Sequence, residues 1–386
     1  MRKTGAYDIA IVGGGPVGAA LALALQDSGF SIVLLEAKPE FAARDPRALA
    51  LSQGTRLILE RLGTWPALAD RATAIESIHV SQRGGLGRAE LRASELGVPA
   101  LGYTAEYGDL YHALAAALPT SGTRLVTGAR VDAVRPASGC GLVEYTLDGQ
   151  AEALTARLIV LADGGKSLPG VLRVKDYGQS ALICTVRTEQ PHARRAYERF
   201  TPEGPIALLP LGDAYALVWT TANAEVETRL GWDDSAFLCA LQSAFGDRQG
   251  RFLAAGPRVV FPLRLVTATD LVRPGLVRIG NAAQTLHPVA GQGFNLGLRD
   301  AWTLAETVLD APREALGQLD RLNAYRAKRR WDVGGGIAMT DLLVELFAND
   351  LPLLSPARGL ALSALDQIPL LKQVFARKMM FGAQAW

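Results

Sequence analysis

Residues 280–300 combine small side chains, a proline and several glycines between a predicted strand over residues 276–279 and a predicted amphipathic helix. Small residues let the backbone approach a flat ligand closely. The helix expected to begin after Gly293 presents free backbone N–H groups, which bind negative charge. This stretch therefore predicts a binding loop for a flat, partly anionic group.

A second glycine-rich loop, near the start of the chain, predicts a nucleotide site. Gly13, Gly15 and Gly18 have the Gly-x-Gly-x-x-Gly spacing. In this pattern the first glycine makes the turn, the second admits a pyrophosphate and the third lets helix and strand pack closely.

The elements around this loop are those that such a site needs. Residues 7–12 are almost continuously apolar, as in a central parallel strand, and an alanine- and leucine-rich helix is predicted to run to about Ser28. A second strand over residues 31–35 ends at Glu36. This carboxylate can accept the ribose hydroxyls of an adenosine and would repel a 2′-phosphate, so the tightly bound dinucleotide is not NADP.

Two further segments distinguish FAD from NAD. Residues 158–165 and 276–283 each read as a strand followed by a tight turn, and no second nucleotide fingerprint occurs downstream. An FAD that extends across a doubly wound sheet needs loops at strand ends for its ribityl chain and flavin ring. The pattern favours FAD.

Three shorter motifs carry a family resemblance. Residues 44–52 read Arg-Asp-Pro-Arg-Ala-Leu-Ala-Leu-Ser, Asp163 precedes Gly164, and Gly280 precedes Asn281. Together with the glycine-rich loops, they resemble the class A flavoprotein monooxygenases, which include p-hydroxybenzoate hydroxylase, and within them the ubiquinone-biosynthesis ring hydroxylases. The resemblance covers nearly the whole chain. It implies an α/β fold, in which an FAD-binding doubly wound domain is interleaved with a mostly antiparallel substrate sheet and followed by C-terminal helices.

The resemblance also implies residue roles. Arg47 would lie near the FAD pyrophosphate, Asp163 would face both FAD and the incoming NAD(P)H, and Asn281 would contact the ribityl hydroxyls. The other cofactor contacts that it implies are Gly13, Gly15, Val17, Gly18, Glu36, Val131, Gly164, Gly280, Gly291, Gln292, Gly293 and Asn295.

The chain departs from the family pattern in four places. Gly280-Asn281 replaces the usual Gly-Asp, and Gln284 replaces a histidine. Asparagine keeps an acceptor oxygen without the charge, and this variant is similar to the branch of the 2-polyprenyl-6-methoxyphenol hydroxylases. Lys166 stands where an arginine is common, and residues 106–110 also lack an arginine. These two losses leave the details of FAD and NAD(P)H contact open.

Length and patterning predict an interleaved chain of two domains. The FAD-binding domain is assigned residues 1–74, 101–178 and 269–330, the substrate domain residues 75–100 and 179–268, and a helical region residues 331–386. Antiparallel strands are expected over residues 75–82, 180–188, 206–211, 214–220 and 257–265, with a tight turn at Gly212-Asp213. Five residues could line the substrate chamber or belong to the core: Leu208, Leu209, Pro210, Leu217 and Trp219.

Composition excludes several classes of function. A net charge of +2 without a basic run argues against nucleic-acid binding. Three scattered cysteines and four histidines show no metal-ligand spacing and fit a reducing, cytoplasmic location. The apolar stretch over residues 9–25 is interrupted by glycines and a proline, so we interpret it as strand, turn and helix rather than as a membrane span.

The last part of the chain leaves two interpretations open. Its apolar positions are flanked by Lys372, Arg377 and Lys378. A helix of this kind can lie on an anionic membrane, here a peripheral contact with the inner membrane, or it can pack on the FAD domain with its basic groups in water.

The preferred hypothesis is an FAD-dependent monooxygenase that consumes NAD(P)H and O₂ and hydroxylates a polyprenylated phenol in ubiquinone biosynthesis, through a flavin C4a-hydroperoxide. Other ubiquinone-biosynthesis proteins are candidate partners. His287 is a tentative catalytic residue, although a role in shaping its loop is favoured. The alternatives are a class A hydroxylase of another lipophilic aromatic compound and an inactive flavin-binding subunit of a biosynthetic complex.

Overall fold

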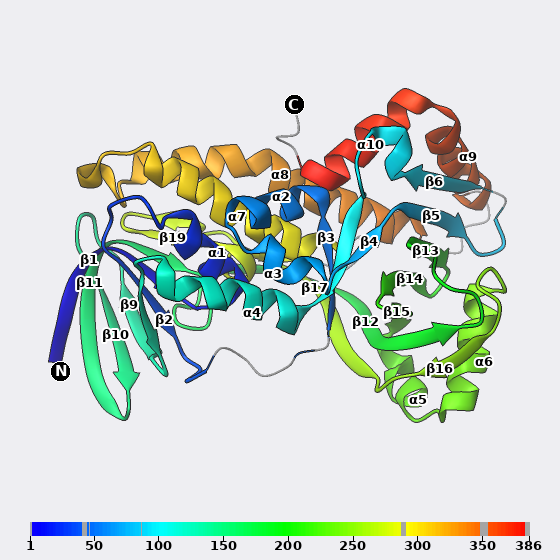
Figure 1. Ribbon diagram of the computed structural model, residues 1–386, viewed down its shortest axis with the longest axis horizontal. Coiled ribbons are helices and arrows are strands. Elements are labelled where there is room, and N and C mark those ends of the chain that lie inside the picture. The colour runs from blue at the N-terminus through cyan, green and yellow to red at the C-terminus, as the bar shows by residue number, and fades with distance from the viewer. Residues whose placement is uncertain are drawn as a thin grey trace.

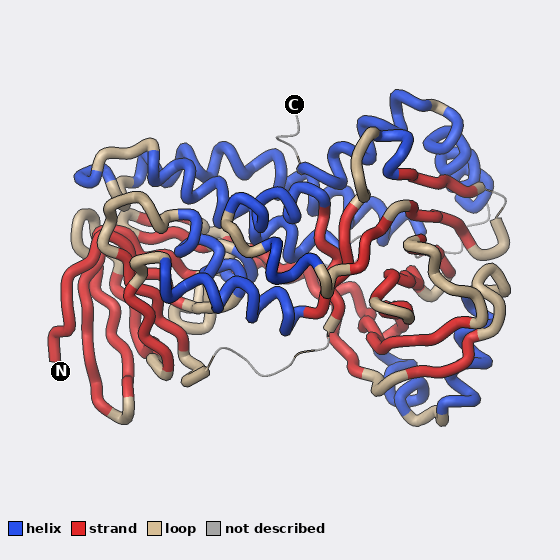
Figure 2. The backbone as a smooth tube through the Cα atoms, in the orientation of Figure 1, coloured by secondary structure: helices blue, strands red, loops and turns tan. Residues whose placement is uncertain are grey.

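The computed structural model describes residues 2–40, 45, 47–85, 87–286, 291–347 and 354–382. In the described residues three sheets are joined side by side, with helices covering them (Figures 1 and 2). The chain enters the second sheet early, returns to the first, and then crosses again. This interleaved α/β arrangement confirms the fold expected from the sequence.

The largest group of helices covers a sheet whose central strands β19, β11, β1, β2 and β8 all run parallel. The buried, apolar residues of β1 and β2 confirm the two strands predicted around the first glycine-rich loop. The strands of this sheet are β1 (Arg2–Val12), β2 (Ile32–Glu36), β8 (Arg124–Thr127), β9 (Arg130–Arg135), β10 (Gly141–Leu147), β11 (Gln150–Leu161), β18 (Val272–Arg273) and β19 (Leu276–Arg278).

Four helices pack together beside this sheet: α1 (Pro16–Ala24), α4 (Tyr107–Ala117), α7 (Gln292–Leu309) and α8 (Leu319–Phe347). The prediction that the first helix reaches Ser28 is wrong, because α1 ends at Ala24 and a turn follows. Asp27, Ser28 and Gly29 favour such a turn, and Gly29 adopts the left-handed conformation with φ of 70°.

The second sheet is mostly antiparallel and has the order β20-β17-β12-β15-β14-β13-β5-β6, with β16 beside β12. Gly212 has a φ of 60° and lies in the tight turn between β14 and β15, as predicted. Strand β12 continues through residue 178, where the sequence analysis places a domain boundary. The domain boundaries themselves stay a prediction. The strands are β5 (Ser77–Gln82), β6 (Arg88–Arg92), β12 (Leu172–Thr188), β13 (Arg195–Thr201), β14 (Gly204–Leu211), β15 (Ala214–Ala222), β16 (Phe252–Ala255), β17 (Val259–Ala268) and β20 (Gln284–Thr285).

Smaller elements close the structure around these two sheets. A three-stranded sheet contains β3 (Ala48–Ser52), β4 (Thr73–Ile75) and β7 (Gly102–Glu106). The remaining helices are α2 (Gln53–Arg61), α3 (Trp65–Ala69), α5 (Val226–Leu230), α6 (Asp234–Phe245), α9 (Leu354–Gln367) and α10 (Pro369–Phe381). Short 3₁₀ turns are η1 (Ala93–Leu96), η2 (Leu118–Thr120), η3 (Asn223–Glu225), η4 (Gly280–Ala282) and η6 (Arg313–Ala315). Figure 1 shows α9 and α10 lying next to β5 and β6, on the opposite side from α5 and α6.

Candidate active site

The first glycine-rich loop connects β1 to α1 and is held by close backbone packing. A Cβ on Gly13 would lie 2.7 Å from the backbone nitrogen of Asp163, and one on Gly18 would lie 2.0 Å from the carbonyl oxygen of Gly13. A Cβ on Gly15, by contrast, would meet no protein atom within 4 Å. The loop therefore leaves open space at the position where the fingerprint expects a pyrophosphate, at the N-terminus of α1.

Glu36 lies at the end of β2 with both carboxylate oxygens engaged. The N–H of Gly14 donates to Oε2 at 2.7 Å, and the N–H of Lys38 donates to Oε1 at 2.9 Å. Glu36 also lines the large cavity described below. The structure thus places it beside the glycine loop, in the position expected of a ribose-binding carboxylate.

The Asp163 loop follows β11 and contacts the first glycine loop. The Asp163 carboxylate accepts hydrogen bonds from the N–H groups of Gly165 at 2.9 Å and Ser167 at 2.7 Å. Gly164 has a φ of 75°, and a Cβ there would meet no protein atom within 4 Å. Asp163 therefore shapes its own loop, and Gly164 opens toward free space.

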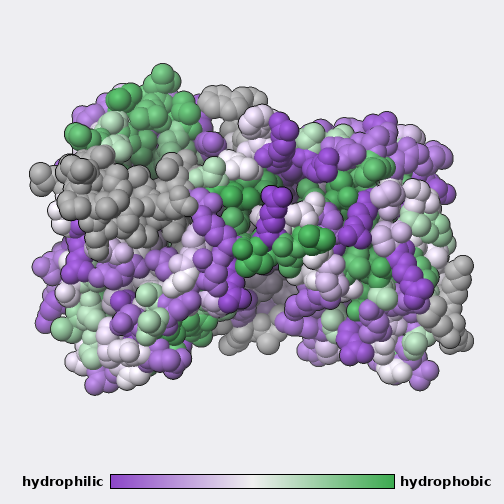
Figure 3. All heavy atoms as spheres, turned by 180° about the vertical axis from the view of Figure 1, so that it is seen from behind, coloured by the Kyte–Doolittle hydropathy of each residue, from purple (hydrophilic) through white to green (hydrophobic). Residues whose placement is uncertain are grey.

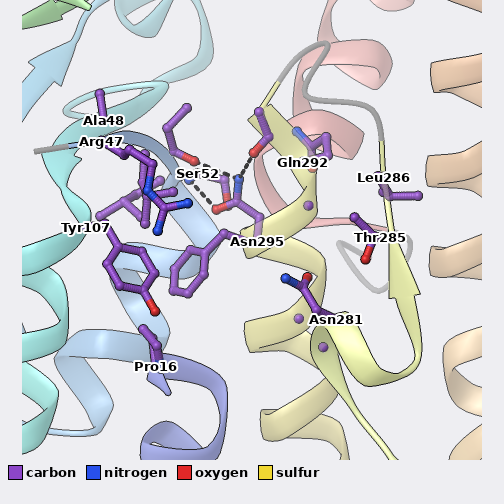
Figure 4. Close-up of a pocket in the computed structure, with 18 of the residues that line it drawn as sticks. Pro16, Arg47, Ala48, Ser52, Tyr107, Asn281, Thr285, Leu286, Gln292 and Asn295 are labelled. Carbon is purple, nitrogen blue, oxygen red and sulfur yellow. Dashed lines mark hydrogen bonds between the residues drawn. The ribbon is translucent and has the colours of Figure 1, made fainter. Parts of the chain in front are cut away.

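The third loop follows β19 and is held down by a buried carboxylate. Oδ2 of Asp300 accepts hydrogen bonds from the N–H of Gly280 at 3.0 Å and from Nε2 of Gln284 at 2.6 Å. Gln284, which replaces the usual histidine, is thus a partner of Asp300. Between these two residues the exposed side chain of Asn281 points toward the space that faces Arg47 and Tyr107 (Figure 4).

Asp300 belongs to a buried ion network between α7 and α8 that the sequence did not suggest. Nε of Arg329 donates to Asp300 at 2.7 Å, and Nη1 of Arg329 donates to Asp332. Burial raises the pKa of Asp300 despite the neighbouring arginine. Burial alone would also raise the pKa of Asp332, but Arg299 and Arg329 together lower it below its ordinary value. The network fixes α7 beneath the third loop.

Helix α7 begins at Gln292, two residues before the expected start after Gly293. Gly291 caps it in the left-handed conformation, with φ of 60°, and a Cβ there would lie 2.7 Å from that of Ala50. A Cβ on Gly293 would meet no protein atom within 4 Å. Gly293 therefore joins Gly15 and Gly164 as a glycine that opens into empty space.

Asn295 lines the cavity, and its side chain is also held by protein. Its Oδ1 accepts from the N–H of Ser52 at 2.8 Å and from the hydroxyl of Thr55 at 2.7 Å, while Nδ2 donates to the carbonyls of Ala50 and Gly291 (Figure 4). All four hydrogen-bonding positions of the side chain are thus used by protein. Asn295 ties β3 to the start of α7, and its contact with a cofactor stays a prediction.

Arg47 lies at the mouth of the site. Its guanidinium pairs with Asp45 and stacks over the rings of Tyr107, at 5.1 Å, and Phe261, at 5.5 Å. The hydrogen bonds that Arg47 donates to the Asp45 carboxylate raise the pKa of Arg47 above its ordinary value. Val131 lines the same cavity, whereas His287 lies outside the described residues.

One cavity of about 1670 Å³ connects all these loops with the second sheet. Of the sheet residues expected to line a chamber, Leu209 does so, together with Ala207 and Val218. Leu208, Leu217 and Trp219 instead face the opposite side of the sheet and form a core with α6. The alternation of side chains along β14 and β15 explains this division, because the period of a strand is two residues. Pro210 is buried and is not among the lining residues.

Comparisons with known proteins identify the family. Residues 6–334 match the family described as FAD binding domain. The chain is 36% identical to ubiquinone hydroxylase UbiL of Rhodospirillum rubrum, over 97% of this chain and 89% of that protein. The chain belongs to this family of FAD-dependent aromatic monooxygenases. It is also 34% identical to the 3-demethoxyubiquinol 3-hydroxylase of Escherichia coli, over 95% of this chain and 96% of that protein.

The fold agrees with that of a solved structure. The p-nitrophenol 4-monooxygenase PnpA from Pseudomonas putida DLL-E4 superposes with a TM-score of 0.81 over the whole of both chains, at 16% identity. Membership of the family makes FAD the cofactor of this monooxygenase, with NAD(P)H and O₂ as co-substrates. The three glycines that open into the cavity, two from loops and one from the first turn of α7, form a cradle that fits an extended dinucleotide.

Proposed function

We propose that this monooxygenase hydroxylates the ring of a polyprenylated phenol in ubiquinone biosynthesis. The observation that carries the proposal is the shape of the cavity, which extends from the FAD cradle to an apolar chamber walled by α9 and α10. A ring bound in that chamber lies in the same space as the cofactor, and an apolar tail fits the walls that these two helices supply. The names of the two relatives described above agree with a substrate of this class.

Different residues of the cradle would bind different parts of FAD. Glu36 would hold the adenosine ribose, and the backbone at Gly15 would hold the pyrophosphate at the N-terminus of α1. Asn281 would contact the ribityl chain, and the start of α7 at Gln292 would stabilise negative charge on the flavin ring. Bound FAD supplies the redox chemistry, taking electrons from NAD(P)H and activating O₂.

The chamber offers the ring mostly apolar walls. The wall from the sheet includes Ala181, Ile183 and Val218, and the wall from the C-terminal helices includes Leu362 and Phe375. An apolar site of this kind would protect a reactive oxygen species from water and would leave few polar groups to compete for the phenol.

We further propose that α9 and α10 contact a lipid surface. Leu360 and Leu370 are each 72% exposed, and Ile368, Leu371 and Val374 add to the same apolar face, which Figure 3 shows at the end of the molecule that carries these helices. Leu371 is both exposed and part of the cavity wall, so the apolar face adjoins the chamber.

Two basic groups flank this apolar face. Arg377 and Lys378 are exposed. Lys372, which the sequence grouped with them, is instead paired with Glu95 and Asp366. Among the described residues no helix is long and apolar enough to cross a membrane. The arrangement is therefore typical of an interfacial contact, from which a lipid-soluble phenol could be collected.

The test of function uses the purified protein loaded with FAD. We expect a short-chain 2-prenyl-6-methoxyphenol to accelerate NADPH or NADH oxidation and to gain one oxygen atom, measured by absorbance and by mass spectrometry. Phenols without a prenyl group serve as controls. Equal stimulation by unprenylated phenols would favour hydroxylation of a different lipophilic ring, and flavin binding without NAD(P)H consumption would favour an inactive subunit.

A further inference from the structure

Glu198 is a carboxylate on the chamber side of the second sheet. Cross-strand pairing places it between Val80 of β5 and Ala207 of β14, and the same row continues through Val218 of β15 to Ile183 of β12. All five residues line the cavity. Glu198 is therefore the one charged position in a row of otherwise apolar side chains.

The carboxylate of Glu198 differs from the other two that line the cavity. Glu36 and Asp163 are engaged by backbone N–H groups and belong to the FAD cradle. Within the described part of the chain, Glu198 makes no hydrogen bond or ion pair with the protein. What it can reach is the interior of the chamber.

The charged groups on the adjoining elements have other partners. His79 of β5, and Arg195 and Arg199 of β13, point to the other face of the sheet, because they alternate with Val80 and Glu198 along their strands. There they contact Arg248, Glu90 and Ser81 respectively. On the helices that close the chamber, Asp366 and Lys372 pair with each other.

Burial raises the pKa of Glu198 to about 8, and desolvation is the only cause. The side chain is partly accessible and lines the cavity. A phenol has a pKa of about 10, so an ordinary glutamate would be too weak a base by roughly six units. At about 8 the gap falls to roughly two units, which suits transfer of a proton within a complex.

We propose that Glu198 is the base that accepts the proton of the substrate's phenolic hydroxyl during ring hydroxylation. The O–H bond of the phenol breaks, its proton moves to a carboxylate oxygen of Glu198, and the electron pair left on oxygen enriches the ring. The ring then takes one oxygen atom from O₂, while NAD(P)H supplies the two electrons that reduce the other atom to water. The hydroxylated carbon then loses its hydrogen as a proton, which is consumed when the other oxygen atom becomes water, and the electron pair of that C–H bond restores the aromatic ring. The original phenolic oxygen recovers its proton from Glu198. This inference rests on the proposed function, since it requires a phenol in the chamber.

The test compares Glu198→Gln with Glu203→Gln in the FAD-loaded enzyme. Glu203 is exposed, has only a 3.9 Å ion pair with Arg83, and does not line the cavity. We expect E198Q to lower the rate of hydroxylation by about 10²-fold or more, the usual effect of losing a general base, and to leave FAD binding unchanged. E203Q should behave as wild type, and Glu198→Asp should recover part of the rate.

The pH profile gives a readout that a merely structural role would not change. The rate of hydroxylation by wild type should rise with pH through an apparent pKa near 8, and E198Q should lose this dependence. An E198Q enzyme with wild-type rate and pH profile would overturn the proposal.

Two further observations separate failure of the inference from other failures. If wild type hydroxylates no phenol, the proposed function fails, and Glu198 loses its role with it. Misfolding of E198Q is checked by thermal unfolding. Because the folded pKa of Glu198 lies above its unfolded value near 4.5, wild type loses stability as the pH rises from about 4.5 toward 8, and the glutamine variant lacks this loss. E198Q should therefore unfold at a temperature at or above that of wild type at pH 8.

Discussion

The first glycine-rich loop requires glycine for two different physical reasons. Gly18 has no room for a side chain, since a Cβ would lie 2.0 Å from the carbonyl oxygen of Gly13. Gly15 has ample room in the protein alone and an ordinary φ of −60°. A bound ligand would explain why no protein atom lies near Gly15, whereas close packing within the protein explains why Gly18 has no room for a side chain.

Alanine at these two positions should therefore give opposite results. We expect Gly15→Ala to leave the thermal unfolding of the FAD-free protein unchanged and to weaken FAD binding by about tenfold or more, a cost of about 1.4 kcal/mol. Gly18→Ala should instead destabilise the FAD-free protein, because its Cβ cannot be accommodated. Fluorescence titration with FAD and melting curves measure both effects. Unchanged FAD affinity in G15A would contradict the assigned pyrophosphate position.

Residues of the site differ in how far the sequence could predict them. The fingerprint glycines and Glu36 were predictable because a strand, a turn and a helix within one short segment dictate their spacing. Glu198 was not, because its significance depends on Val80 and Ala207, which reach it only through strand pairing. Asn295 was placed in the right loop, but its partners on β3 could not be predicted from spacing along the chain.

Helices α9 and α10 have two faces with separate uses. One face lines the chamber through residues such as Leu362 and Met380, which are almost fully buried. The other exposes Leu360 and Leu370, beside the basic Arg377. A contact with lipid would thus be made by the same elements that enclose the substrate.

Replacement of both exposed leucines by aspartate should weaken binding of the protein to lipid vesicles. Burying one leucine in an apolar phase is worth about 1.5–3 kcal/mol, so Leu360→Asp with Leu370→Asp should lower the fraction that sediments with anionic vesicles by about tenfold or more. Leu253→Asp, at a residue 54% exposed on β16, is the matched control and should sediment as wild type. Equal sedimentation of all three proteins would rule out this surface as the contact. Deletion of the residues past 355 should also reduce sedimentation with anionic vesicles.

Strands and helices could be predicted from the sequence where the pattern of apolar residues follows a single period. The apolar runs of β1 and β2 and the alternation of β14 and β15 gave the correct strands. Strand β13 was missed, because Glu198 and Arg199 stand between its buried Tyr197 and Phe200, and no regular alternation of apolar and polar residues results. The end of α1 was placed too late, since alanine and leucine continue the helical composition up to a turn that local sequence favours only weakly.

The whole molecule is organised around one cavity whose walls come from distant parts of the chain. Gly15 and Gly164 face it from two loops of the first sheet, Gly293 from the first turn of α7, and Met380 from α10. Interleaving of the segments 77–92 and 172–268 into the second sheet means that neither sheet is a continuous piece of sequence. A ligand bound in this cavity would contact both sheets and the C-terminal helices at the same time.

Removal of FAD should therefore destabilise the molecule as one cooperative unit. With free FAD at 100 times its dissociation constant, the folded state gains about 2.7 kcal/mol, and the whole melting transition should move to higher temperature. ADP, which would reach only Glu36 and the first glycine loop, should give a smaller shift. Calorimetry that resolved two transitions, only one of them sensitive to FAD, would contradict this coupling.

The origin of the cavity walls also bears on how the cofactor is acquired in the cell. The ribosome makes the loop of residues 13–18 early, whereas α7 and then α10 are synthesised much later. A nascent chain that has only the first loop has only one of the three glycines that open into the cavity. We therefore expect the protein to acquire FAD in the last stage of synthesis or after it.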